Sequence, residues 1–454
     1  MAELSPEHAA DLSAAAMGRA FVAGEADPVA VTEVFLEWIA ATDEPVFLTV
    51  TAERARAEAK AAAARIRAGR PASPLDGVPI AWKDLFDIAG TTTTAASALL
   101  RDTPAAEADA PVVAQAAAAG LVCLGKTNLT EFAYSGLGLN PHFGTPANPH
   151  DTAVRRAPGG SSSGSGVAVG AGLAPIAIGT DTGGSVRVPA AFNGAVGYKA
   201  SEGRIDGRAV FPLSWTLDTV GPLCRTVEDC MLTEAAMRGA PATVRRADVR
   251  DLRILVSTTF FCDDIDDTVA ADFEAALKRL ADAGVTIDHE PVPELAESAR
   301  LMAAHGTLAA VEGYQFHQAR VDSDDAQKID RRVLSRLQGG KAMKGLDVLI
   351  IQQTRKSLAE SLAERLAGRL LVGPTVAHVA PEIAPLDADD ALFHRVNLKT
   401  LRNTMVGNYL NTPGVTIPMA GDGLPTGLLI SGNAGEDEAV LSAGLALETI
   451  IRGA

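Results

Sequence analysis

The sequence predicts an α/β fold, in which helices pack against a largely buried β-sheet. Hydrophobic residues make up 47% of the 454 residues, enough for a large core, and aromatic residues make up only 4%. That composition suits helices packed closely on a sheet. Helical segments also alternate with short apolar runs along much of the chain, a pattern typical of layered α/β proteins.

The first 70 residues are expected to form helices. Residues 12–22 are small and apolar, and residues 29–39 carry apolar side chains at helical spacing. Residues 53–68 are rich in Ala, Arg and Glu and end at Gly69, a typical helix stop. The next apolar run, residues 77–84, is predicted to be a strand.

The alternation of helix and strand continues downstream. Residues 112–119 are expected to form a helix, followed by a strand at 121–124 and a turn at 125–128. Short strands are also expected at 254–256, after a helical stretch, and at 285–287. The latter follows the helix expected at 273–283.

Residues 143–225 are rich in Gly, Ser, Thr and Pro, yet apolar runs interrupt them. A flexible linker would not carry so much Val, Ile and Leu, so the glycines indicate turns and close approach of backbone segments. We expect the functional site in this stretch. Beyond it the chain has amphipathic helices, then β-like runs at 413–419 and 427–431 and a closing helix at 437–451.

The charge balance argues against some classes of partner. Forty Lys and Arg residues against 56 Asp and Glu residues give a formal net charge of −16 at pH 7. Such a surface repels phosphate backbones and anionic lipids, so direct binding to nucleic acid or to a membrane is not expected. No uninterrupted apolar run reaches membrane-spanning length, and the first residues lack the basic region of a signal peptide.

The four cysteines are Cys123, Cys224, Cys230 and Cys262. They form no CxxC pair and no spacing typical of a zinc site with histidine. We therefore expect reduced thiols in a cytoplasmic protein, with no metal site.

The candidate chemistry lies in the sequences PGGSSSGSG at residues 158–166 and GTDTGGSVRVP at residues 179–189. One interpretation is a glycine-rich loop that binds phosphate. However, the pattern GxxxxGK[ST] is absent, because no lysine follows Gly164 or Gly166.

A second interpretation is the nucleophile elbow GxSxG, which residues 160–164 match. That motif is short, and any GSSSG loop satisfies it. It also requires an acidic residue and then a histidine further along the chain. The downstream histidines, none in a distinctive setting, are His289, His305, His317, His378 and His394.

A third interpretation needs no histidine. A serine hydroxyl can be activated by a second hydroxyl, which a neutral lysine deprotonates. The Ser-x-x-Lys spacing of β-lactamases is absent, so the lysine must come from elsewhere in the chain. Lys83 is best placed, although a simple ion pair with Asp84 at a strand end is the plainer structural alternative.

These motifs together resemble the amidase signature family. Its hallmark is a Gly/Ser-rich segment, here residues 158–199, joined to an upstream G-[VI]-P-x-x-x-K-D motif, here residues 77–84. Ser161 and Ser185 are 24 residues apart, which also fits the family. Further matches occur at residues 125–133, 144–149, 217–222 and 423–428.

The resemblance implies a Ser-Ser-Lys triad. Ser185 would attack the amide carbonyl, Ser161 would take its proton and later pass one to the leaving amine, and Lys83 would act as base toward Ser161. The peptide bond between Gly160 and Ser161 would be cis. Lys83 must be uncharged, so its pKa must fall from near 10.4 by roughly 3 units, or about 4 kcal/mol, which burial could supply.

The resemblance also implies an oxyanion hole formed by the backbone N–H groups of Thr182, Gly183 and Gly184, together with that of Ser185. The residues expected to support the triad are Ser162, Thr180, Asp181 and Arg187. Asp181 and Arg187 would pair and brace the nucleophile loop, and Thr180 would hydrogen-bond near Ser161.

The substrate pocket implied by the resemblance would be lined by Phe132, Ala133, Tyr134 and Ser135. Two segments depart from the family's usual pattern. Residues 161–165 read SSSGS instead of SSGGS, and residues 197–201 read GYKAS instead of GLKPT. Neither departure touches the triad, but together they leave the subfamily open.

The expected protein is one amidase domain over residues 1–454, with an α/β/α arrangement around a mixed sheet. Its parts are expected to be N-terminal helices (1–70), a catalytic core (75–235), a more variable helical region over the site (240–370) and a return to the core (372–454).

The expected reaction is hydrolysis of a small-molecule amide through an acyl-enzyme on Ser185, with no metal or cofactor, and a homodimer is one expected assembly. One alternative is the amidase subunit of a tRNA-dependent amidotransferase, which shares the triad. A non-catalytic protein that binds a ligand in the same pocket is a second alternative.

Overall fold

Eleven strands form one mixed sheet within residues 4–453, the part of the chain that the computed structural model describes. The strands are β1 (Phe47–Val50), β2 (Pro79–Lys83), β3 (Val122–Thr127), β4 (Ile176–Asp181), β5 (Val196–Lys199), β6 (Thr219–Cys224), β7 (Arg253–Ser257), β8 (Thr286–Glu290), β9 (Leu370–Pro374), β10 (Gly414–Pro418) and β11 (Gly427–Ser431). Their order across the sheet is β1-β3-β2-β4-β6-β5-β10-β11-β9-β7-β8. β2 is parallel to β3 and β4, and β7 is parallel to β8 and β9. The pair β1–β3 is antiparallel, and so is each pair of neighbours in the run β4-β6-β5-β10-β11-β9. The predicted α/β class with a mixed sheet is confirmed.

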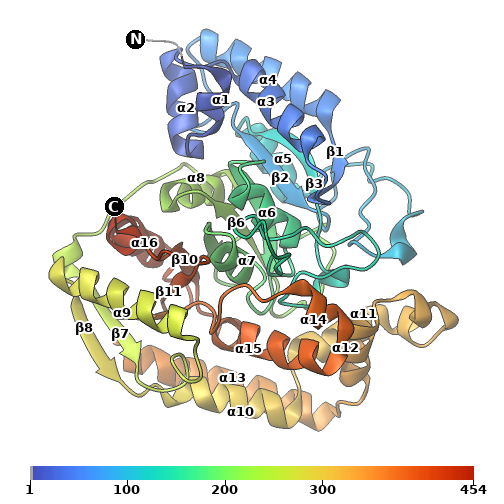
Figure 1. Cartoon of the computed structure of the whole chain (residues 1–454), viewed down its shortest axis with the longest axis vertical. Helices are drawn as coiled ribbons and strands as arrows, with labels where there is room; N and C mark the ends of the chain where they lie inside the picture. The colour runs from blue at the N-terminus through green and yellow to red at the C-terminus, as the bar shows by residue number, and fades with distance from the viewer. Residues whose placement is uncertain (1–3, 454) are drawn as a thin grey trace.

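Helices cover both faces of this sheet (Figure 1). They are α1 (Pro6–Ala10), α2 (Ala14–Ala23), α3 (Pro28–Ala41), α4 (Ala52–Arg67), α5 (Pro111–Ala118), α6 (Ser163–Gly170), α7 (Arg187–Phe192), α8 (Val227–Met237), α9 (Asp267–Asp282), α10 (Pro293–His305), α11 (Leu308–Val321), α12 (Arg331–Lys341), α13 (Gly345–Leu366), α14 (Ile383–Ala388), α15 (Asp390–Tyr409) and α16 (Asp437–Arg452). In β10, Val415 and Ile417 lie against Gly444 of α16. Thr416 lies between them on the opposite face, where α7 packs, because side chains alternate along a strand.

Most of the predicted elements are present. The helices expected at 12–22, 29–39, 53–68, 112–119, 273–283 and 437–451 correspond to α2, α3, α4, α5, α9 and α16. The strands expected at 77–84, 121–124, 254–256, 285–287, 413–419 and 427–431 correspond to β2, β3, β7, β8, β10 and β11. The central strands are buried along their whole length, whereas the edge strands β1 and β8 are partly exposed.

The turn expected at residues 125–128 is wrong, because β3 continues to Thr127. Gly125 has a φ of 147°, and the pairing of β3 with β1 and β2 shifts register near it. A Cβ at this position would lie 2.1 Å from the carbonyl oxygen of Thr49. The glycine that suggested a turn therefore belongs to an irregular stretch within the strand, where a neighbouring backbone approaches closely.

The segment 240–370, expected to be helical, contains helices α9 to α13 and also supplies β7 and β8 to one edge of the sheet. Figure 1 shows this edge far from the N-terminal helices α1 to α4, which gather at the other end beside β1 and β3. None of the helices within residues 4–453 is both long and apolar enough to cross a lipid bilayer.

The parallel strands β2 and β4 position the candidate site. Ala81 lies opposite Ala177 and Trp82 opposite Ile178, so the carboxyl ends of both strands meet at one edge of the sheet. The chain after β4 forms a short loop that leads into α7. In α/β sheets, ligands commonly bind just outside the carboxyl ends of parallel strands.

Candidate active site

Lys83, the last residue of β2, lies at the centre of a buried hydroxyl cluster. Its Nζ donates hydrogen bonds to Oγ of Ser161, at 2.7 Å, and to Oγ1 of Thr180, at 2.9 Å. Lys83 and Ser161 are both 0% exposed. Strand β4 delivers Thr180 to this point because it runs parallel to β2, while the backbone before α6 delivers Ser161.

Burial controls the charge of Lys83. The loss of solvent lowers the pKa of its amine from 10.5 to about 7, against the opposing influence of the carboxylates of Asp218 and Asp181. The amine is therefore neutral in a large fraction of molecules near neutral pH. The alternative in which Lys83 pairs with Asp84 is excluded, because the Asp84 carboxylate binds Nζ of Lys126 at 2.6 Å. Adjacent residues of a strand face opposite sides of a sheet.

Lys199, at the end of β5, is a second buried lysine near the same loop. Burial and the charge of Arg187 lower its pKa to about 8. Its Nζ donates to the carbonyl oxygens of Ala200, at 2.9 Å, and Thr412, at 3.1 Å. Neither partner is a hydroxyl, so Lys83 is the lysine that contacts a candidate serine.

The two candidate serines lie on adjacent segments. The backbone N–H of Ser162 donates to the carbonyl oxygen of Ser185 at 3.4 Å, and the peptide bond between Gly160 and Ser161 is cis. Within the described residues, no hydrogen bond joins the side chains of Ser161 and Ser185. Catalytic hydrogen bonds are often long in unliganded enzymes and shorten when substrate is present. The hydroxyl of Ser162 makes a weak bond, at 3.5 Å, to the carbonyl oxygen of Thr180.

The loop between β4 and α7 lies beside a cavity. Thr182, Gly183 and Ser185 line the cavity, and in the part of the chain described here the N–H groups of Gly183 and Ser185 have no acceptor. The N–H of Gly184 instead donates to Oδ1 of Asp181 at 2.8 Å. Gly184 is therefore removed from the expected oxyanion hole, whose remaining candidates are the other three residues.

Gly184 has a different reason to be glycine. Its φ is 130°, and a Cβ there would lie 2.1 Å from Oγ1 of Thr404, on α15. At Gly183 the corresponding Cβ would meet only Met405, at an ordinary 3.7 Å. Glycine is therefore required at position 184 because α15 lies too close for a side chain, and not because an oxyanion must approach the backbone there.

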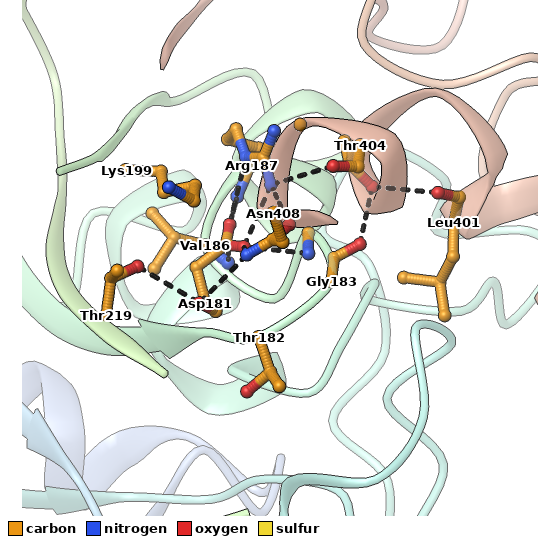
Figure 2. Close-up of polar contacts among 12 residues, drawn as sticks. Asp181, Thr182, Gly183, Val186, Arg187, Lys199, Thr219, Leu401, Thr404 and Asn408 are labelled. Atoms are coloured by element: carbon orange, nitrogen blue, oxygen red, sulfur yellow. Dashed lines mark hydrogen bonds and ion pairs between the residues drawn. The ribbon is translucent and has the colours of Figure 1, made fainter. Parts of the chain in front are cut away.

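Asp181 and Arg187 brace this loop from within, as Figure 2 shows. The Asp181 carboxylate accepts two hydrogen bonds from the Arg187 guanidinium, at 2.9 and 3.0 Å, and others from backbone N–H groups of the loop. Burial alone would raise the pKa of Asp181, but the charge and hydrogen bonds of Arg187 hold it well below its ordinary value. The pair is fully buried and fixes the start of α7 against the end of β4.

Helix α15 completes the brace with residues that the sequence analysis missed. Asn408 donates to Oδ1 of Asp181 at 2.9 Å and accepts from Arg187 at 2.5 Å, and Oγ1 of Thr404 donates to the carbonyl oxygen of Gly183 at 2.7 Å (Figure 2). The two residues are one helical turn apart and both are buried. Two polar residues four positions apart in an otherwise apolar helical segment were the sequence pattern that could have indicated them.

Asp218 was also missed as a site residue, although its motif was noticed. Its carboxylate accepts from Oγ1 of Thr182 at 2.5 Å and from the backbone N–H groups of Leu213 and Ser214. Its negative charge is the largest influence that opposes the low pKa of Lys83. Asp218 therefore contacts the loop that carries Ser185 and also raises the pKa of Lys83 against the effect of burial.

The cavity beside Ser185 has a volume of about 280 Å³, at the small end of ligand sites. Ala133, Tyr134 and Ser135 line it, as the resemblance implied, together with residues such as Leu217, Met302, Met343, Leu401 and Met405. Phe132 departs from the expectation, because it is not among the lining residues and its ring packs on His317 with centroids 4.0 Å apart. The cavity suits a small, mostly apolar molecule.

The sequence matches the model of the family described as Amidase over residues 30–441. A 2-amino-5-chloromuconic acid deaminase of Comamonas testosteroni is 35% identical over 414 residues, covering 88% of this chain and 87% of the relative. One subunit of the glutamyl-tRNA(Gln) amidotransferase of Ralstonia nicotianae is 33% identical over 452 residues, covering 88% of this chain and 90% of the relative.

Structural similarity leads to the same family. A crystal structure of an amidase matches with a TM-score of 0.86 and 28% identity, covering 97% of this chain and 100% of that one. This chain therefore belongs to the amidase family. It is an amidohydrolase that acts on amide C–N bonds, as predicted from the sequence.

Proposed function

We propose that this chain hydrolyses a small-molecule carboxamide, with Ser185 as nucleophile, Ser161 as proton relay and Lys83 as base. The observation that carries this proposal is the buried amine of Lys83, 2.7 Å from Oγ of Ser161 and with a pKa of about 7. A neutral amine at that distance can accept the Ser161 proton near neutral pH.

The reaction would begin with attack of Oγ of Ser185 on the amide carbonyl carbon. The Ser185 proton passes to Oγ of Ser161 as the Ser161 proton passes to Nζ of Lys83. The carbonyl oxygen becomes an oxyanion, stabilised by backbone N–H groups of Thr182, Gly183 and Ser185. Ser161 then protonates the leaving nitrogen and regains a proton from Lys83, and the C–N bond breaks.

The acyl-enzyme on Ser185 would then be hydrolysed by the same relay in the opposite sense. Water gives one proton to Ser161, and its oxygen attacks the acyl carbon. Collapse of the second tetrahedral intermediate returns a proton to Oγ of Ser185 and releases the carboxylic acid. The products are thus one acid and one ammonia or amine.

The amidase component of a tRNA-dependent amidotransferase is the second candidate, because a 33% identical relative is named as part of such an enzyme. Such a component would draw ammonia from glutamine, whose α-ammonium group needs an anionic or carbonyl partner. Within the described residues, the cavity has no Asp or Glu in its lining. The absence of a carboxylate in the described lining favours an amide without an ammonium group over glutamine.

The test is ammonia release by the purified chain, without partner or ATP, from a panel of simple amides and glutamine. Ser185→Ala and Lys83→Ala should lose turnover by at least about 1,000-fold, and Ser161→Ala should also be severely impaired. Ser163→Ala is the matched control, because that hydroxyl lies in the same segment and is buried without a partner among the described residues. Near-wild-type turnover of Lys83→Ala at neutral pH would contradict the relay.

Three further expectations stay predictions. We propose that residues 1–454 act as one amidase domain, since a single sheet uses strands from β1 to β11. A cytoplasmic location is proposed from the four free thiols. A homodimer is proposed as well, and sedimentation at several concentrations would measure it.

A further inference from the structure

One charged side chain lies in the lining of the otherwise uncharged cavity beside Ser185. Among the described residues that line this cavity, Arg336 of α12 is the only one of the types Asp, Glu, Lys, Arg and His. The rest are mainly aliphatic, Met, Gly and Thr residues. A cation placed there is costly unless a partner offsets its lost hydration.

Within residues 4–453, Arg336 has no carboxylate partner, unlike its neighbours on α12. Arg331 pairs with Asp390 at 2.8 Å, and Arg332 pairs with Asp330 at 2.7 Å and with Asp387 at 2.8 Å. Arg336 makes no ion pair in this part of the chain, and its Nε is buried without a hydrogen-bond partner. Of the three arginines on α12, two therefore form ion pairs with carboxylates, whereas Arg336 keeps N–H donors available for a ligand.

The position of Arg336 is nonetheless well defined. Its guanidinium lies over the ring of Tyr134, with Cζ 4.4 Å from the ring centroid. Stacking on an aromatic face orients the plane of a guanidinium and leaves its edge, which carries the N–H donors, available. Tyr134 and Arg336 line the same cavity as Ser185.

We propose that the amide substrate carries a carboxylate, separate from the bond that is cleaved, and that Arg336 binds it. The inference rests on the proposed amidase function and names its substrate class: monoamides of dicarboxylic acids. The planar guanidinium matches a carboxylate with two parallel hydrogen bonds, and an apolar surrounding strengthens them. The net charge of −16 repels an anion at long range, so selectivity for the acid must come from this local cation.

The experiment compares pairs of amides that have the same number of carbons. Succinamate, glutaramate and adipamate each end in a carboxylate, whereas butanamide, pentanamide and hexanamide end in a methyl group. The wild-type chain should prefer the acids in kcat/KM, and Arg336→Gln should reduce the ratio of acid to neutral substrate by on the order of 10- to 100-fold. Most of the change should appear in KM. The ratio for Arg336→Lys should lie between those of the wild type and Arg336→Gln, because lysine keeps the positive charge but lacks the two parallel N–H donors of the guanidinium.

Arg331→Gln is the matched control, because this residue lies on the same helix, outside the cavity lining, and pairs with Asp390. It should leave the ratio of acid to neutral substrate unchanged. A wild-type chain without preference for the acids would overturn the proposal. An Arg336→Gln variant whose kcat/KM falls equally for both series would do the same, since that is the result of a purely structural role beside Tyr134.

A binding measurement separates this proposal from the proposed function. Calorimetric titration of Ser185→Ala with the same amides reports recognition without turnover. If no amide releases ammonia, the amidase proposal fails, but tighter binding of the acids that disappears in Ser185→Ala/Arg336→Gln still supports Arg336 as the carboxylate site. Equal affinity for acids and neutral amides overturns it.

Discussion

Acidification should switch off amide hydrolysis through Lys83. With a pKa of about 7, the neutral amine makes up about 90% of molecules at pH about 8, about 10% at pH about 6 and about 1% at pH about 5. If the neutral form is the base, kcat/KM should fall about tenfold for each pH unit below about 6 and reach a plateau above about 8. A lysine at its ordinary pKa of 10.5 would instead give a rate that rises through the whole range.

Substitution of Asp218 tests whether the fall in kcat/KM at low pH, the acid limb of the profile, reflects protonation of Lys83. The Asp218 carboxylate raises the pKa of Lys83 against the larger effect of burial, so Asp218→Asn should move the acid limb to lower pH. Asparagine keeps the shape and one acceptor oxygen for the Thr182 hydroxyl. The assay is ammonia release at constant ionic strength, with Ser185→Ala as the blank. A kcat/KM that does not change from about pH 5 to 9, or an acid limb that Asp218→Asn moves to higher pH, would refute the reasoning.

Two other substitutions follow from the same geometry. Lys83→Met should stabilise the inactive protein at neutral pH by roughly 2–3 kcal/mol, because it removes the cost of burying the charged amine, about 4–5 kcal/mol, but also loses the hydrogen bonds to two hydroxyls. The pKa of Lys83 is lower in the folded than in the unfolded protein, so this cost is complete below about pH 7 and disappears as the pH rises toward 10.5. Denaturant unfolding at several pH values measures this, and a gain that grows with pH would contradict it. Asn408→Ala should cost about 1–3 kcal/mol of stability and lower kcat on the order of tenfold, because the Asp181 carboxylate loses a partner. Asn403→Ala, on the same helix but bonded to the carbonyl oxygens of two other segments, should cost similar stability without the loss of kcat, and equal kcat values for the two variants would exclude a positioning role for Asn408.

The sequence was sufficient for the elements whose signals are local. The helix at residues 53–68 has a regular composition and a glycine stop, and the closing helix and the strand at 427–431 were placed almost to the residue. The family resemblance placed Lys83 and Ser161 in one relay, and their side chains are in hydrogen-bond contact. Local composition thus predicts elements, and a long motif predicts which of them meet.

Other features depended on contacts that no local pattern encodes. The family resemblance assigned the Gly184 N–H to an oxyanion hole, yet this N–H donates to Asp181, and α15 packs closely against Gly184. Asn408 lies 227 residues from Asp181 along the chain. Arg336 looked like any other charged residue of an amphipathic helix. Only the tertiary packing of α12 beside Tyr134 distinguishes it.

The distance along the chain between Asp181 and Asn408 sets an order for biosynthesis. During translation at roughly 5–20 residues per second, the 227 residues between them take about 10 to 45 s to appear. Until α15 emerges, the nascent polypeptide lacks the amide that bonds both members of the Asp181–Arg187 pair. The ribosome-bound fragment therefore carries Lys83, Ser161 and Ser185 well before it carries α15, and hydrolytic competence should arise late, when α15 docks.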